Sequence, residues 1–203
     1  MVAVAISMMP PAHRSTSSPA RPATRVELTR MHRPGYVDQV QEISVRGGGY
    51  LDPDTYVNAD SYQVALAAAG GLVEAACAVI DGRVNNAFAL VRPPGHHAMP
   101  GQGMGFCLFG NVVIAAQAAR LDRGLGRVLI VDFDVHHGNG TQDIFWSDAS
   151  LMYCSTHQMP LYPGTGDVSE RGDHDNIVNA PLRAGDGGEQ FRAAMESRIL
   201  PRL

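Results

Sequence analysis

The stretch VLIVDFDVHHGNG, residues 128–140, decides how the rest of this chain is interpreted. It opens with four apolar, mostly β-branched residues, 128–131, a pattern that predicts a strand buried on both faces of a sheet. Polar residues follow at once, where such a strand gives way to a loop. In open α/β sheets, ligands bind just beyond the carboxyl ends of the strands. The stretch therefore predicts both a fold class and the place of a site.

The polar part of this stretch has the composition of a metal site. Asp134 and His136 are two residues apart, so in extended backbone their side chains leave the chain on the same side. A carboxylate oxygen and an imidazole nitrogen together suit zinc or a similar divalent ion. The alternative is a strand-end cluster satisfied by its own hydrogen bonds. So dense a group of carboxylates and imidazoles disfavours that alternative, because such groups are costly to bury unpaired.

The bulk composition excludes some classes of partner. The 203 residues suffice for one domain or for a large part of a bigger one. The formal net charge of -4 predicts neither direct nucleic-acid binding nor an anionic membrane surface as a partner. Cys77, Cys107 and Cys154 each lie in an apolar run and indicate reduced, buried thiols in a cytoplasmic protein. The apolar start lacks a basic region and is too short to span a membrane.

The order of apolar patterns predicts an α/β fold. Residues 1–23 predict an irregular or flexible lead-in, and order is expected from Thr24, which forms a capping-box pattern with Glu27. A short helix interrupted at Pro34 follows, and residues 51–56 predict a turn-rich loop. This order of strands and helices favours a largely parallel sheet with helices on both faces. Further helices are expected at about 36–45, 59–80, 112–121 and 185–203, and strands at 87–91, 128–131, 151–154 and 177–178.

A second pair of histidines, His96 and His97, stands after the predicted strand 87–91 in a loop stiffened by two prolines. Because the carboxyl ends of parallel strands meet at one edge of a sheet, we expect this pair near residues 132–139. One pair can bind a metal while the other moves protons, which is the arrangement that metal-assisted hydrolysis needs. Asp132 and Asn139 flank the metal candidates and can orient a histidine.

Four motifs in order carry a family resemblance. They are RPPGHHA at 92–98, the stretch from 105 to 111, VDFDVHHGNG at 131–140 and YPGTG at 162–166. Together they resemble signatures of the zinc-dependent histone deacetylase superfamily, which includes acetylpolyamine amidohydrolases and acetoin-utilisation-type deacetylases. The resemblance implies an arginase/deacetylase-like α/β fold, with residues 24–203 as the N-terminal portion of the catalytic domain. It also implies hydrolysis of an N-acetyl amide, in acetyl-lysine or a small acetylated amine.

The resemblance assigns roles to the polar residues of both stretches. It implies that Asp134 and His136 are zinc ligands and that His96 and His97 are the tandem catalytic pair. Asp132 would then pair with His96, and Asn139 with His97. An amide orients an imidazole but does not favour its charged form as a carboxylate does. His97 is therefore predicted to be the general base, and His96 to act electrostatically.

The resemblance also implies a substrate tunnel and a second ion. Gly105, Phe106 and Tyr162 match positions that line the acyl-lysine tunnel of the family. The alternative for the two aromatic residues is ordinary core packing. A structural potassium ion is implied near five residues, largely through backbone oxygens: Asp132, Asp134, His136, Ser155 and Thr156.

Two parts of the family's site have no match in this sequence. The family uses a third zinc ligand, a later aspartate, and a tyrosine in a later Gly-Gly-Tyr segment that binds the substrate carbonyl. Gly48-Gly49-Tyr50 lies on the wrong side of the histidines for that role. We therefore expect the chain to resemble the front portion of such a domain, incomplete at its C-terminus. Five downstream residues offer donors for a third ligand without matching the pattern: His157, Asp167, Asp173, His174 and Asp175.

Two other functions compete with this hypothesis. A truncated, catalytically weak or inactive domain could serve only as a binding module for acetylated ligands or another subunit. An exposed sheet edge would favour such association, including a homo-oligomer. An arginase-like hydrolase with two metal ions is the second alternative, and it calls for more carboxylate ligands and for manganese. The His96-His97 pair after Arg92-Pro-Pro-Gly argues against it.

Overall fold

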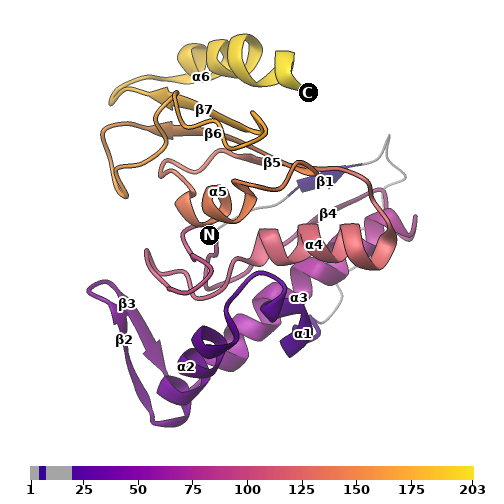
Figure 1. Ribbon diagram of the computed structural model, residues 1–203, viewed down its shortest axis with the longest axis vertical. Helices are drawn as coiled ribbons and strands as arrows, with labels where there is room; N and C mark the ends of the chain where they lie inside the picture. The colour runs from indigo at the N-terminus through magenta and orange to yellow at the C-terminus, as the bar shows by residue number, and fades with distance from the viewer. Residues whose placement is uncertain (1–4, 8–19) are drawn as a thin grey trace. The chain divides into compact units, whose positions relative to one another are not determined.

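The computed structural model describes residues 5–7 and 20–203 and divides into two compact units, Met1–Gly126 and Arg127–Leu203 (Figure 1). In the N-terminal unit, α1 (Arg25–Thr29) begins at Thr24. The Thr24 hydroxyl accepts from the Glu27 N–H at 3.2 Å, and the Glu27 carboxylate accepts from the Thr24 N–H at 2.7 Å. The predicted capping box is therefore confirmed. Helix α2 (Pro34–Val45) starts with proline at its first position, which lacks the N–H that would go unpaired there.

Two long helices form the core of the N-terminal unit. α3 (Ser61–Ile80) packs against α4 (Asn111–Arg123), and both match predicted helices. α3 is apolar enough to cross a membrane by length and composition, but half of that stretch is buried, as in a core helix. Gly70 allows residues 21–23 to cross the helix, because a Cβ there would lie 2.1 Å from the Arg21 carbonyl oxygen. The absence of a side chain at Gly70 thus permits close packing at this point of α3.

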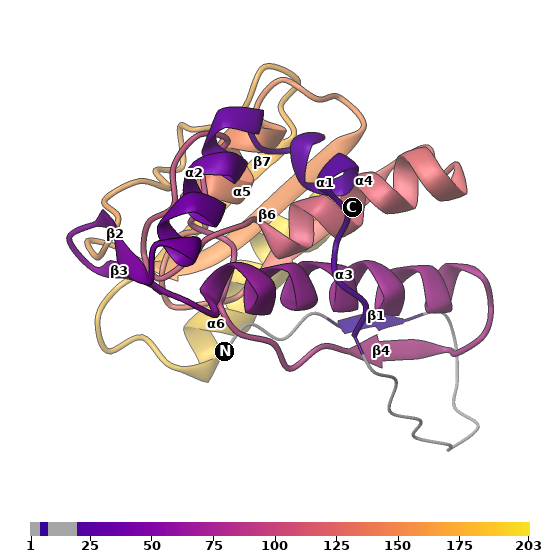
Figure 2. The same cartoon turned by 90° about the horizontal axis from the view of Figure 1, so that it is seen from below.

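Two short ribbons in the N-terminal unit differ from the sequence predictions. β2 (Gly48–Asp52) and β3 (Thr55–Asn58) pair as an antiparallel hairpin where a loop was expected. β4 (Asn86–Phe88) pairs with β1 (Ala5–Ser7) beside α3 (Figure 2). The prediction of a buried strand at 87–91 is wrong, since Phe88 and Leu90 are exposed on this two-stranded ribbon. β1 lies within the expected lead-in, of which residues 1–4 and 8–19 are outside the described residues.

The C-terminal unit is a three-stranded parallel sheet, which confirms the α/β prediction. Its strands are β5 (Val128–Asp132), β6 (Leu151–Gln158) and β7 (Ile177–Leu182), paired in that order. Figure 1 shows α5 (Asn139–Phe145) and α6 (Gly188–Ala194) on opposite sides of it. β6, in the centre, is largely buried, and so are the first four residues of β7. β5 lies at an edge of this sheet. Only Ile130 of this strand is buried and Leu129 is 41% exposed, so the prediction that β5 is buried on both faces is wrong.

The end of the chain packs on β6 and β7. The predicted C-terminal helix is not continuous: α6 is followed by a π-helical turn, Met195–Ile199, and a 3-10 turn, Leu200–Arg202. Ile199 is fully buried against Cys154, Val178 and Ala180. Cys77, Cys107 and Cys154 form no disulfide and are buried, as predicted.

Candidate active site

The histidine pair occupies a tightly packed loop of the N-terminal unit. His96 and His97 are buried, and their ring centroids are 4.0 Å apart. Gly95 allows this loop to press against the start of α4, because a Cβ there would lie 2.6 Å from the Asn111 amide nitrogen. The Asn111 side-chain amide also donates to the Pro93 carbonyl at 3.0 Å. The backbone before the pair is therefore held on both sides.

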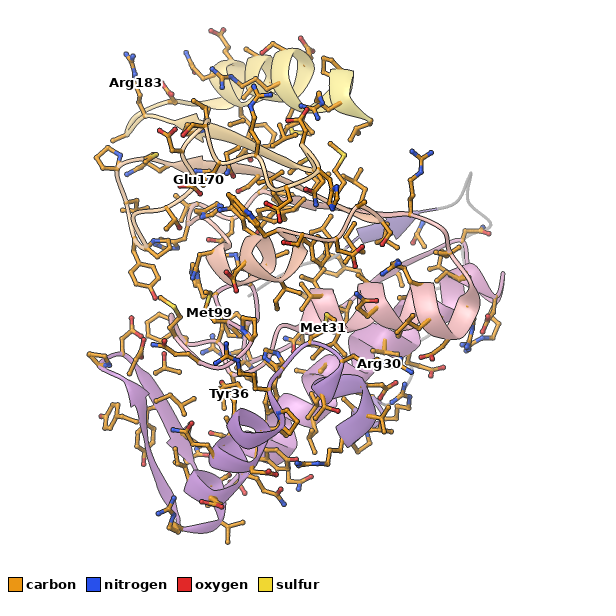
Figure 3. The ribbon with its side chains drawn as sticks, in the orientation of Figure 1. Arg30, Met31, Tyr36, Met99, Glu170 and Arg183 are labelled. Atoms are coloured by element: carbon orange, nitrogen blue, oxygen red, sulfur yellow. The ribbon has the colours of Figure 1, made fainter. Side chains whose placement is uncertain are left out.

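The loop that follows the pair is fastened by residues that the sequence analysis did not single out. The Gly110 N–H donates to His32 Nε2 at 2.9 Å, so Nδ1 of that ring carries the proton and donates to the Met99 carbonyl at 3.1 Å. The Tyr36 hydroxyl donates to the Leu108 carbonyl at 2.5 Å. Figure 3 labels Tyr36, which lies on α2, and Met99, which lies in the loop after the histidine pair. Burial lowers the pKa of His32 to about 4, so the ring is neutral at pH 7.

The fastened loop presents Gly105 and Phe106. Both residues have positive φ angles, 56° and 65°, and the bulky side chain makes that conformation unusual at Phe106. The Phe106 N–H donates to the Thr55 hydroxyl on β3 at 3.1 Å, which holds the bend in place. The Phe106 side chain is 61% exposed, so the alternative of ordinary core packing does not describe it.

In the C-terminal unit, a buried tyrosine orients Asp132 at the end of β5. The Tyr153 hydroxyl donates to Asp132 Oδ2 at 3.1 Å and accepts from the Gly138 N–H at 3.1 Å. Asp132 Oδ1 accepts from the Asp134 N–H at 3.1 Å. The carboxylate direction is therefore set from two sides. Sequence reasoning missed Tyr153, whose only signal was its place in an apolar strand.

Asp134, His136 and Tyr162 come together beside that carboxylate. Asp134 Oδ1 accepts from the His136 N–H at 2.8 Å and lies 3.3 Å from His136 Nδ1. The Tyr162 ring stands edge-on to the His136 ring, with centroids 6.1 Å apart. Tyr162 is 38% exposed, so it is not a core residue. Asn139 opens α5 directly after this cluster.

The donor chemistry of Asp134 and His136 fits zinc only in part. They supply a carboxylate oxygen and an imidazole nitrogen from one short turn. No group of three or more His, Cys, Asp or Glu side chains that could hold a metal ion occurs within residues 20–203 as the structure describes them. Other partners engage four of the five residues considered as third ligands: His157 contacts Ser155, Asp167 contacts Ser169, Asp173 contacts Trp146, and Asp175 contacts Arg202.

Two residues named for the potassium site lie next to Asp132 in the sheet. The register of β5 and β6 pairs Asp132 with Ser155, and Thr156 follows. Both β6 residues are buried, and in the described structure the Thr156 hydroxyl has no hydrogen-bond partner. The Asp132 carboxylate and the Ser155 hydroxyl thus belong to paired residues of neighbouring strands.

The predicted site residues are divided between the two units. His96, His97, Gly105 and Phe106 belong to the N-terminal unit. The other five belong to the C-terminal unit: Asp132, Asp134, His136, Asn139 and Tyr162. The pairings of His96 with Asp132 and of His97 with Asn139 join residues of different units and stay predictions.

The chain is similar to known proteins over most of its length. The chain matches the histone deacetylase domain family over residues 3–203. It is 39% identical to the histone deacetylase-like amidohydrolase of Pseudomonas aeruginosa, over 91% of this chain and 50% of that protein. A probable deacetylase of Archaeoglobus fulgidus is 42% identical, over 88% and 50%. The crystal structure of the HDA15 HD domain matches with a TM-score of 0.85 and 42% identity, over 90% of this chain and 55% of that one. The chain thus spans about half the length of these relatives.

Proposed function

Because this chain belongs to the histone deacetylase domain family, we propose that it serves the zinc-dependent hydrolysis of an N-acetyl amide. The observation that supports this function best is the cluster at the end of β5. There the Asp134 carboxylate and the His136 ring lie 3.3 Å apart, and Tyr162 stands against the same ring. The substrate is acetyl-lysine in a protein or a small acetylated amine. Three buried cysteines that form no disulfide fit a reducing compartment, and we place the protein in the cytoplasm.

Asp134 and His136 are the residues that would hold zinc. When bound, zinc would polarise the amide carbonyl and make the attacking water more acidic. Catalytic zinc sites in proteins use three protein ligands, so we expect these 203 residues alone to hold the ion weakly. The potassium ion is assigned to the oxygen atoms around Asp132 and Ser155, which lie opposite each other in the sheet.

The histidine pair moves the protons in this proposal. His97 takes a proton from the water that adds to the carbonyl carbon. The C–N bond then breaks, and the same pair gives a proton to the leaving amine, so the products are acetate and a free amine. His96 stabilises the developing charge. Burial of both rings suits this work, because a low dielectric strengthens their electrostatic effect.

Phe106 and Tyr162 are assigned to binding the acyl-lysine side chain. Both are aromatic, both are solvent-accessible, and each lies on a loop that polar contacts fasten to its own unit. An alkyl chain that packs on an aromatic face is held by burial of apolar surface. Gly105 gives the Phe106 loop its left-handed bend.

The test combines zinc content with turnover of a fluorogenic acetyl-lysine peptide by this chain. The variant is His136→Ala, and the control is Arg192→Ala, at an exposed residue of the same unit that has no part in the proposed site. Because the ion is held weakly, the assay contains excess zinc; under this condition we expect bound zinc and turnover in the wild type and the control, and loss of both in His136→Ala. Turnover that survives His136→Ala would refute the assigned site. A folded protein with neither zinc nor turnover would favour the binding module, which binding of the acetylated peptide would then reveal.

A further inference from the structure

A partly buried polar network in the C-terminal unit centres on a residue not named so far. Its centre is Glu170, which Figure 3 labels. Glu170 Oε2 accepts from the Gln142 side-chain amide at 2.6 Å and from the Gly166 N–H at 3.0 Å. Glu170 Oε1 accepts from the Asp167 N–H at 3.2 Å. The carboxylate therefore joins α5 to the loop that carries the YPGTG motif.

Only one assignment of donors and acceptors satisfies all the hydrogen bonds of this network. An ionised carboxylate can only accept, so Gln142 must turn its NH2 group toward Glu170. Its oxygen then faces His137 Nε2 at 3.0 Å and the Asn179 amide at 2.7 Å. The Gln142 oxygen can only accept, so a neutral His137 ring carries its proton on Nε2. His137 Nδ1 consequently accepts from the Thr165 hydroxyl, at 2.8 Å.

The network thus holds the loop at two points, Glu170 and Thr165. Between these two points, Gly166 lies against two imidazole rings. A Cβ at Gly166 would lie 2.4 Å from His157 Nε2 and 2.7 Å from His137 Cγ. His157 Nε2 donates to the Gly166 carbonyl at 3.0 Å. The loop backbone has no room to shift toward the sheet.

This fastening acts on both sides of the contact between Tyr162 and His136. Tyr162 lies three residues before Thr165, and His136 is the neighbour of His137 in the chain. Each of these two rings therefore has a residue of the network close to it in the chain: Thr165 for Tyr162, and His137 for His136. If the loop loosened, the Tyr162 ring would be displaced, whereas Asp134 and His136 would stay in place on their own turn.

We propose that Glu170 and Gln142 are positioning residues, which hold the loop 160–170 so that Tyr162 lies against His136 and binds the acyl chain of the substrate. This inference rests on the proposed function. It assigns the network to substrate affinity and not to bond cleavage. Neither residue touches the reacting atoms in this assignment.

The test is Glu170→Gln, with the exposed Glu196→Gln as matched control. A glutamine at 170 has one acceptor oxygen where three donors converge. We expect Kd and KM for a labelled acetyl-lysine peptide to rise about tenfold, with kcat within about twofold, since uniform binding is what is lost. Amide hydrogen exchange at Gly166 and Asp167 should become faster. Glu196→Gln should change none of these.

A rescue separates positioning from general stability. In the exchange Gln142→Glu with Glu170→Gln, the carboxylate at 142 accepts from His137, Asn179 and the new amide at 170. We expect this double variant to recover part of the affinity that Glu170→Gln loses, because the bond between residues 142 and 170 returns while the Gly166 N–H, which shares Oε2 in the wild type, stays without that acceptor. Thr165→Val, which removes only one hydroxyl donor, should raise Kd in the same direction by less and covers the case that Glu170→Gln does not fold.

The outcomes separate this inference from the proposed function. Faster exchange in Glu170→Gln with wild-type Kd and KM would overturn the positioning role. Unchanged exchange would overturn the fastening itself. A wild type that neither binds nor hydrolyses the acetylated peptide would refute the proposed function, and the substrate role of the loop with it, while the exchange rates still decide whether Glu170 fastens the loop.

Discussion

The Tyr153 hydroxyl is hydrogen-bonded to Asp132 Oδ2 at 3.1 Å, across two neighbouring strands of the parallel sheet. Tyr153 is fully buried, and the same hydroxyl accepts from the Gly138 N–H. The Tyr153 hydroxyl therefore orients the Asp132 carboxylate and also holds the backbone at Gly138, directly before α5. The position of Asp132 depends on a residue 21 positions away in the chain.

Tyr153→Phe is expected to destabilise the protein by about 1–3 kcal/mol, because the buried Gly138 N–H loses its acceptor. If the proposed function holds, kcat should also fall, since Asp132 would no longer be oriented from β6. Urea unfolding and peptide turnover measure the two effects. Tyr50→Phe, at an exposed tyrosine, is the control. Unchanged stability in Tyr153→Phe would contradict the geometry.

Gly164 and Gly166 provide a matched pair that separates backbone strain from steric overlap. Both have positive φ angles, 87° and 95°, but only Gly166 has neighbours where a Cβ would lie. We expect Gly164→Ala to cost about 1–2 kcal/mol, as a left-handed residue with a side chain does. Gly166→Ala should cost at least about 2 kcal/mol more, because the overlap is with two buried rings. Equal losses in urea unfolding would argue against the described packing of the loop.

His32 predicts a pH-dependent stability with a definite sign. Burial lowers its pKa in the folded protein from 6.5 to about 4. Below pH 6.5 the unfolded chain binds a proton that the folded chain refuses until about pH 4, so stability is lost as the pH falls through this range. At pH 5 this linkage costs the wild type about 2 kcal/mol.

His32→Phe removes the titrating group and both of its backbone hydrogen bonds. We expect the variant to be less stable than the wild type at pH 7.5, and the difference to shrink by about 2 kcal/mol at pH 5. Urea unfolding at the two pH values gives the difference directly, so contributions from other buried histidines cancel. His174→Gln serves as control. A difference that is the same at both pH values would show that His32 does not titrate in this way.

Asp134→Asn tests the proposed metal ligand with little change of shape. The amide oxygen can still accept from the His136 N–H, but the negative charge toward the cation is lost. We expect the dissociation constant for zinc, measured by calorimetric titration at pH 7.5, to rise at least about tenfold, as loss of a ligand's charge implies. Asp186→Asn, at an exposed aspartate outside the proposed site, should leave it unchanged. Equal affinities in both variants would remove Asp134 from the metal site.

Local patterns in the sequence predicted what depends on neighbouring residues. The capping box at Thr24, the helix over residues 59–80 and the strand at 128–131 were all predicted, because spacing and side-chain type act within a few residues. The same reasoning erred where burial depends on distant partners. β5 lies at a sheet edge, β4 pairs only within a two-stranded ribbon, and residues 51–56 belong to a hairpin.

The sequence by itself determined the α/β order of elements, the two histidine pairs and the Asp134–His136 spacing, since each is a property of residues close together in the chain. Only the tertiary structure decided which groups orient them. His32 bonds Gly110 from 78 residues away, and Gln142 bonds Glu170 from 28. Such partners carry no local signal, because a buried donor selects its acceptor by position in space and by the direction in which each hydrogen bond must run.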